Sequence, residues 1–177
     1  AELGRHDAVK TLVPLLHEAV PLIAHTAIRN RGTIGGSLAY ADPAAELPAC
    51  CVALDATIIT ASAAGERRIA AADFFTGLFT TALRPKELIK AVEFPRVAAG
   101  ERATILELTR RAGDYAMAGV VARGMVTGTT ISEPRFVFFG VGPGPVTATR
   151  AAAAVDGKTL TPGVFAATTP WAVSAAT

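Results

Sequence analysis

The first part of the chain carries apolar residues at the spacing of a helix. Charged and polar residues separate them, and the apolar positions between residues 7 and 28 are Val9, Leu12, Val13, Leu16, Val20 and Ile23. This period of three to four residues predicts an amphipathic helix. Pro14 and Pro21 interrupt it, because proline lacks the N–H that a helix interior requires. We therefore predict two short helices, followed by a short strand at residues 26–28.

After residue 50 the pattern becomes typical of β-structure. Residues 52–61 are rich in Thr and Ile and predict a strand, and residues 64–67 predict the turn of a hairpin. Residues 116–127 are small and apolar and fit either a helix or a buried strand. Three further runs predict strands: residues 87–95, 104–108 and 134–141.

A small, polar, glycine-containing link at residues 97–102 separates two groups of elements. It predicts a domain boundary, with one domain over residues 1–98 and a second over residues 99–177. The mixture of short helices and strands places the chain in the α+β class.

The composition is that of a globular protein with a real core, since 51% of the 177 residues are hydrophobic and 18% are charged. A net charge of +2 gives no reason to expect nucleic acid as a partner. No apolar run is long enough for a membrane span. The adjacent Cys50 and Cys51 form no disulfide framework or metal quartet, so we expect buried thiols in a reducing, cytoplasmic setting. His17 and His25 are interpreted as surface or packing residues, because no carboxylate lies at ligand spacing from them.

The strongest candidate for a binding site is the stretch TIGGSLAYADPAAE at residues 33–46. Gly35 and Gly36 have no Cβ, so their backbone can approach a ligand closely. Asp42 and Glu46 follow and supply two carboxylates. The combination suggests peptide N–H groups for a phosphate and a carboxylate for a sugar hydroxyl or an amine. On composition alone, a plain turn explains the glycine pair equally well.

Four runs in the same order resemble one family: IRNRGTIGGSLAYADPAAELP, DFFTGLFTTAL, ELIKAVEFP and LTRRAGDYAMAGVVA. Together they resemble the FAD-binding medium subunit of molybdenum hydroxylases, most of all the carbon monoxide dehydrogenase flavoprotein. The flavin domain of xanthine dehydrogenase is a more distant relative. The resemblance runs over residues 12–146. It implies the second lobe of a vanillyl-alcohol-oxidase-type FAD-binding domain, followed by a small C-terminal α+β domain with an antiparallel sheet.

The resemblance also implies which residues contact FAD. The segment from Thr33 to Ser37 matches the loop that lines the FAD diphosphate through backbone N–H groups and two hydroxyls. Glu46 matches an acidic FAD contact, with Asp42 as a secondary candidate. The complete set of implied cofactor-binding residues is Thr33, Ile34, Gly35, Gly36, Ser37, Asp42, Glu46, Ile89 and Tyr115.

The last two of these residues match positions beside the isoalloxazine. Ile89 would touch that region, and Tyr115 would pack against the ring, where an aromatic side chain can influence its redox poise. Arg110, Arg111 and Asp114 would shape the loop that presents Tyr115, although each arginine also fits an ordinary surface ion pair.

The electron path implied by the resemblance involves two partner subunits. FAD would accept electrons from an iron–sulfur small subunit, which takes them from a molybdopterin large subunit where the substrate is oxidised. FAD would then pass them to an external acceptor. The chain is thus expected to be an oxidoreductase subunit without a catalytic nucleophile or base of its own.

Three departures from the family pattern affect this interpretation. A glycine-rich loop of the AGGT type, expected some tens of residues before Leu12, is absent, so we expect the chain to lack the first FAD lobe. Glu107 stands where relatives commonly carry Lys, and the usual long C-terminal helical region gives way to a short tail after Val155. The missing first lobe favours an alternative in which the chain is a cofactor-free docking module, whereas the TIGGS run and Tyr115 favour FAD binding. A hydroxylase acting on an aldehyde, nicotine or a purine is a further alternative.

Overall fold

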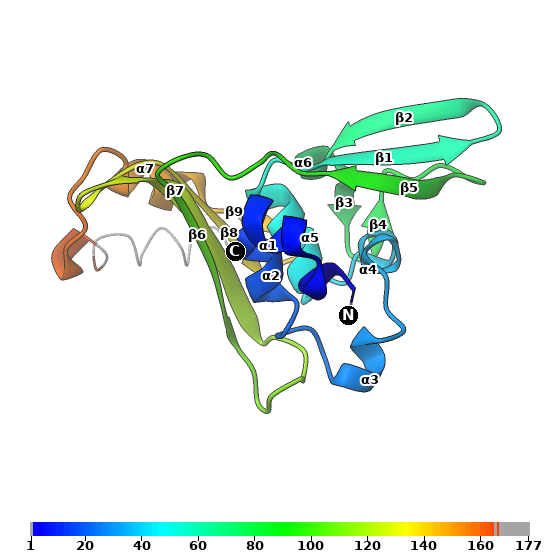
Figure 1. Ribbon diagram of the computed structural model, residues 1–177, viewed down its shortest axis with the longest axis horizontal. Coiled ribbons are helices and arrows are strands. Elements are labelled where there is room, and N and C mark those ends of the chain that lie inside the picture. The colour runs from blue at the N-terminus through cyan, green and yellow to red at the C-terminus, as the bar shows by residue number, and fades with distance from the viewer. Residues whose placement is uncertain (1, 165, 167–177) are drawn as a thin grey trace.

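The N-terminal part of the molecule is a series of short helices (Figure 1). The structure is a computed structural model that describes residues 2–164 and 166, so the final tail lies largely outside the described residues. The helices are η1 (Leu3–Arg5), α1 (Asp7–Leu12), α2 (Pro14–Ala19), α3 (Thr26–Arg29), α4 (Ile34–Tyr40) and α5 (Glu46–Ala53). Pro14 is the first residue of α2, which confirms the predicted interruption. The strand predicted at residues 26–28 is wrong, because these residues form α3 after the extended His25.

Helix α5 explains a second error of the sequence interpretation. All eight of its residues are buried, so it has no polar face that would reveal a helical period. Residues 52 and 53 therefore belong to this helix, and the strand β1 begins later and spans Thr57–Ser62.

The first sheet has the strand order β2-β1-β5 and is antiparallel throughout. The strands β2 (Gly65–Ala70) and β5 (Leu88–Glu93) confirm the predicted hairpin and the strand predicted at residues 87–95. Between them lie α6 (Ala71–Phe74) and a small ribbon of β3 (Phe75–Gly77) and β4 (Thr80–Thr81).

The second sheet has the antiparallel order β6-β7-β8-β9. Its members are β6 (Glu101–Leu108), β7 (Ala118–Thr127), β8 (Thr130–Phe139) and β9 (Val146–Thr147), and α7 (Thr149–Val155) packs against β8. The sheet decides the open choice at residues 116–127 in favour of a strand. It also confirms the α+β class with an antiparallel sheet in the C-terminal part.

The core lies between the two sheets, where α2 and α5 are stacked (Figure 1). One continuous buried cluster joins Leu15 and Leu16 of α2 to α5, and reaches Val137 and Phe139 of the second sheet. Within the described residues, no helix has the length and apolar character needed to cross a membrane.

Two arginines of the second sheet hold the carboxyl end of α5. Arg123 Nη1 donates to the carbonyl of Ala53 over 3.0 Å, and Arg135 Nη1 donates to the carbonyl of Val52 over 3.0 Å. Both guanidinium groups also pair with Asp55. Cations at a helix carboxyl end satisfy its free carbonyls and oppose its dipole, so these contacts fix α5 against the second sheet.

A separate ion pair ties together the strands of the first sheet. Arg67 donates to Glu87 from Nε over 2.8 Å and from Nη2 over 2.6 Å, and the Arg84 N–H and the Thr60 hydroxyl donate to the same carboxylate. These bonds, with the one from Arg67 foremost, lower the pKa of Glu87 to about 2. The carboxylate is therefore ionised in the folded protein at any ordinary pH.

The first testable prediction concerns the acid sensitivity of this carboxylate. Since its folded pKa lies below the unfolded value, its contribution to stability is present above about pH 4.5 and is lost as the pH falls toward 2. Glu87→Gln should therefore lower the free energy of unfolding at pH 7 and much less at pH 3, as measured by urea denaturation. Glu66→Gln is the matched control, because its ion pair with Lys90 is exposed and contributes little. An equal loss for Glu87→Gln at both pH values would contradict the prediction.

Candidate functional site

A cleft of about 970 Å³ lies beside α3, α4 and the start of α5, facing the loop that joins β6 and β7. Figure 1 shows this loop and α3 at the same lower end of the molecule. The volume is at the upper end of the range of about 300–1,000 Å³ that is typical of sites for small molecules. The polar and aromatic residues that line it are His25, Arg29, Arg31, Thr33, Ser37, Tyr40, Asp42, Glu46, Arg110, Asp114 and Tyr115.

The glycine pair lies in the first turn of α4. Thr33 is the N-cap of this helix, and its Oγ1 accepts a hydrogen bond of 2.9 Å from the Gly36 N–H. Ser37 N–H bonds the Thr33 carbonyl over 3.1 Å. The peptide N–H groups of Ile34 and Gly35 are those that a helix leaves without partners in its own backbone. The stretch is thus a capped helix start, and not a plain turn.

The two glycines face different neighbours. A Cβ on Gly36 would lie 2.9 Å from Thr33 Oγ1, whereas a Cβ on Gly35 would lie 3.8 Å from Ile89 Cβ. Gly36 lines the cleft, and Ile89 of β5 packs behind α4, outside the residues that line the cleft. Of the two glycines, only Gly36 both leaves room for the capping hydroxyl of Thr33 and lines the cleft.

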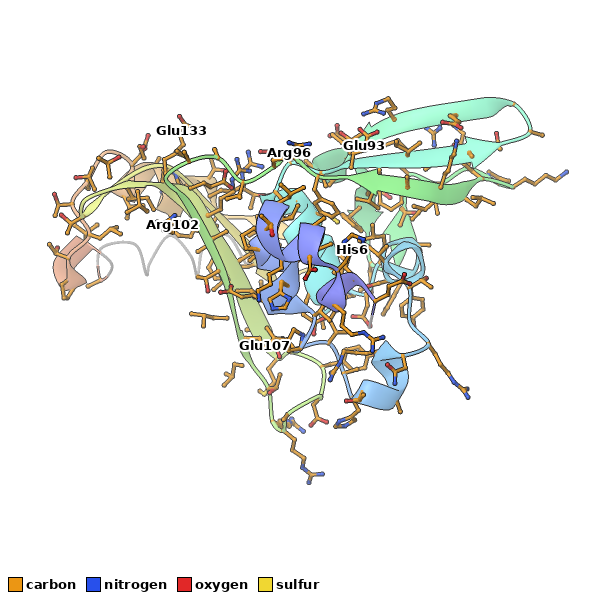
Figure 2. The ribbon with its side chains drawn as sticks, in the orientation of Figure 1. His6, Glu93, Arg96, Arg102, Glu107 and Glu133 are labelled. Carbon is orange, nitrogen blue, oxygen red and sulfur yellow. The ribbon has the colours of Figure 1, made fainter. Side chains whose placement is uncertain are left out.

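The carboxylates at the base of the cleft differ in their surroundings. Asp42 Oδ1 accepts from the Ala44 N–H over 2.9 Å and so shapes the turn before α5. Glu46 is 7% exposed, and its burial raises its pKa to about 7, with the nearby charges of Glu107 and Asp42 adding to the rise. Figure 2 places Glu107 on β6, near the β6–β7 loop, and among the described residues its Oε2 is buried without a hydrogen-bond partner.

The second prediction follows from the raised pKa of Glu46. Because the folded state holds this proton more tightly than the unfolded chain does, the carboxyl favours folding at low pH, and that advantage is lost as the pH rises from about 4.5 through 7. Glu46→Gln stays neutral, so at pH 8 it should be more stable than the native protein by about 1–3 kcal/mol, and at pH 4.5 nearly equal to it. Urea denaturation at both pH values measures the difference. Glu18→Gln, at an exposed position of α2, is the control; a Glu46→Gln gain that does not depend on pH would refute the argument.

Two tyrosines supply exposed aromatic surface at the cleft. Tyr115 of the β6–β7 loop is 71% exposed, and Tyr40 of α4 is 61% exposed. The Tyr40 ring lies 5.2 Å from that of Phe79, centroid to centroid. Exposed aromatic faces beside a cleft are suited to stacking against a flat ring system.

Comparison with known families identifies what the cleft belongs to. The model of the FAD-binding domain in molybdopterin dehydrogenase matches residues 1–97, and that of the CO dehydrogenase flavoprotein C-terminal domain matches residues 103–176. The chain belongs to this FAD-binding family.

Similar proteins of this family are dehydrogenase and hydroxylase subunits. The glyceraldehyde dehydrogenase medium chain of Sulfolobus acidocaldarius is 41% identical, over 88% of this chain and 55% of the relative. The carbon monoxide dehydrogenase medium chain of Hydrogenophaga pseudoflava is 36% identical, over 76% of this chain and 47% of the relative. The chain therefore spans about half the length of these relatives.

Solved structures agree with the family. Carbon monoxide dehydrogenase from Hydrogenophaga pseudoflava superposes with a TM-score of 0.93 at 35% identity, covering 98% of this chain and 60% of that chain. Quinoline 2-oxidoreductase from Pseudomonas putida 86 gives a TM-score of 0.90 at 35% identity, covering 96% of this chain and 59% of that chain. The fold is thus that of the FAD-binding subunit of molybdenum hydroxylases, and FAD is the cofactor of the family.

The residues of the cleft fit FAD. Gly36 keeps open a space that a larger side chain would fill, and Thr33 and Ser37 bring hydroxyls to the same helix turn. Arg31 and Arg110 line the cleft and supply positive charge suited to a diphosphate. By contrast, no group of three or more metal-binding side chains occurs in the described part of the chain.

Most of the cofactor-binding residues expected from the resemblance come together here. Seven of them line the cleft: Thr33, Ile34, Gly36, Ser37, Asp42, Glu46 and Tyr115. Gly35 and Ile89 are not among the residues that line it, and a Cβ built on Gly35 would lie 3.8 Å from Ile89 Cβ. The sequence interpretation missed Tyr40, which lies one helical turn after Gly36 on the same face of α4. It also missed His25, since nothing in the local sequence connects His25 with residues more than eighty positions later.

Proposed function

We propose that this chain binds FAD as part of an electron-transfer subunit of a molybdenum hydroxylase, of the type of aerobic carbon monoxide dehydrogenase. One observation carries the proposal: the cleft brings the capped start of α4 and Tyr115, from the two parts of the chain, to one cavity. Its volume, its arginine side chains and its exposed aromatic rings suit a dinucleotide with a flat ring system.

Different residues of the cleft would contact different parts of FAD. The N–H groups of Ile34 and Gly35 and the hydroxyl of Ser37 would donate to phosphate oxygens, while Arg31 and Arg110 would balance the charge. When bound, FAD supplies the capacity to accept and release electrons. The protein would orient the cofactor and exclude water from it.

At the other end of the cofactor, Tyr115 would pack against the flavin ring. The buried carboxyl of Glu46, which exchanges its proton near neutral pH, would form a hydrogen bond with a polar group of FAD. Ile89 would act from behind α4, by holding the Gly35 backbone in place.

An iron–sulfur small subunit and a molybdopterin large subunit are the proposed partners. Relatives support this, because several are named as subunits or medium chains of complexes, among them a nicotine 6-hydroxylase medium subunit and a 6-hydroxypseudooxynicotine dehydrogenase complex subunit. Their names cover different substrates, so the substrate of the complex would be selected on another chain. We therefore propose the electron-transfer role without a particular substrate.

The third prediction tests the proposal directly. Titration of the 177-residue chain with FAD should shift the flavin absorption band and quench its fluorescence, because the ring enters a less polar site beside Tyr115. Tyr115→Ala should leave the unfolding transition unchanged, since the side chain is exposed, and should weaken FAD binding or shift its reduction potential. Tyr40→Ala gives a comparison at the other exposed tyrosine. Absence of any FAD uptake by the native chain would favour the cofactor-free docking module instead.

A further inference from the structure

The imidazole of His25 lies directly against Gly113 of the β6–β7 loop. A Cβ built on Gly113 would be 2.6 Å from His25 Cε1, 2.6 Å from Nδ1 and 3.2 Å from Cγ. The ring therefore occupies the space that any other residue at position 113 would need. Both residues line the cleft together with Tyr115, so the contact joins its two sides.

The His25 side of this contact is held in place by Arg29. The Arg29 guanidinium reaches back from α3 and donates to the carbonyls of Ile23 over 2.7 Å and of Pro21 over 3.3 Å, as well as to that of Ala24. Bonds from one planar cation to successive carbonyls fix the backbone that presents the His25 ring, while the ring itself is exposed. The position of the ring is therefore set by this backbone and by its contact with Gly113.

The Gly113 side is a closed loop. Asp114 N–H bonds the Arg111 carbonyl over 3.0 Å, and Met117 N–H bonds the Leu108 carbonyl over 2.8 Å at the base of the loop. Gly113 occupies the third position of the turn with φ +85°, which glycine adopts without strain. Because Tyr115 follows two residues later, the height of this turn sets where the tyrosine lies over the cleft.

From these contacts we infer that His25 is a positioning residue for the cofactor: its ring sets the β6–β7 loop through Gly113 and so places Tyr115 over the cleft. The inference rests on the proposed FAD-binding function. It assigns a role to a histidine that lies far from Tyr115 in the sequence. The two sides of the cleft meet at the contact between His25 and Gly113.

A double-mutant cycle tests this inference. Gly113→Ala should push the loop away from His25, raise hydrogen exchange in residues 109–117 and weaken FAD binding by about tenfold or more. In the His25→Ala background the methyl group has room and only the strain of a positive φ remains, so Gly113→Ala should affect both quantities at least about threefold less than in the native background. Displacement of Tyr115 should also raise the fluorescence of bound FAD in the single variant Gly113→Ala.

Gly157→Ala is the matched control, because Gly157 also has a positive φ, +70°, but has open space around its Cβ position. Gly157→Ala should leave hydrogen exchange in residues 109–117 and the affinity for FAD unchanged. Equal effects of Gly113→Ala in the presence and absence of His25 would overturn the inference, because the ring would then not be the obstacle. If the native chain took up no FAD, the proposed function would fail separately, while the exchange cycle measured without FAD would still decide whether His25 sets the loop.

Discussion

Gly36→Val is expected to abolish FAD binding while leaving the fold intact. The new Cβ would lie 2.9 Å from Thr33 Oγ1, which forces the capping hydroxyl off the Gly36 N–H, and its methyl groups would project into the cleft. Loss of the cap costs about 0.5–2 kcal/mol, which is tolerable for a folded domain. Obstruction of the diphosphate position should weaken FAD binding by more than about a hundredfold, since several hydrogen bonds are lost together. Titration followed by flavin absorbance measures the loss.

The neighbouring glycine provides the control. Gly35→Ala places its methyl group 3.8 Å from Ile89 Cβ, which is an ordinary contact behind the helix, so FAD binding should stay within about threefold of the native value. The affinity of Gly36→Ala for FAD should lie between those of Gly36→Val and Gly35→Ala. Unchanged flavin occupancy in Gly36→Val would mean that the start of α4 has a structural role alone.

Gly119→Ala should give the largest loss of stability. Gly119 pairs with Glu107 and Phe139 in the second sheet, and its Cβ would lie 2.1 Å from Phe139 Cζ and 2.4 Å from Cε1. The phenylalanine is completely buried, so its ring has nowhere to move. We expect the free energy of unfolding to fall by about 3 kcal/mol or more, as measured by urea denaturation.

A second substitution tests the cause of this loss. Phe139→Leu alone should destabilise the protein through the cavity it leaves, but combined with Gly119→Ala it should cost less than the sum of the single effects. Additive losses would show that the phenylalanine ring is not the group that excludes a side chain at position 119.

Elements with a one-sided pattern could be predicted from the sequence, and wholly buried ones could not. In the strand β5 exposed residues flank the less exposed Ile89 and Val92, and the strand appeared where it was expected. Helix α5 has no polar face, so its apolar residues were assigned in part to the following strand. Helix α3 (Thr26–Arg29) has only four residues, too few to show a helical period, so residues 26–28 were predicted as a strand.

The pattern of residues alone indicated the candidate site only where its residues are close in sequence, and Tyr115 was expected from the family resemblance. The stretch from Thr33 to Glu46 could be found because its glycines and carboxylates form one local motif. The pairing of His25 with Gly113 depends on how the β6–β7 loop folds back to α3, which no local pattern contains. The same holds for the part of the rise in the Glu46 pKa that comes from Glu107, because this carboxyl lies about sixty positions later in the chain.

Helix α5 connects the cleft with the second sheet. Its amino end carries Glu46 at the cleft, and its carboxyl end is held by Arg123 and Arg135. A rise in temperature that loosens these guanidinium contacts would release the helix as a whole, because its eight residues span little more than two turns. The cleft and the second sheet should consequently unfold in one cooperative step, and release of added FAD should report on the unfolding of strands that do not line the cleft.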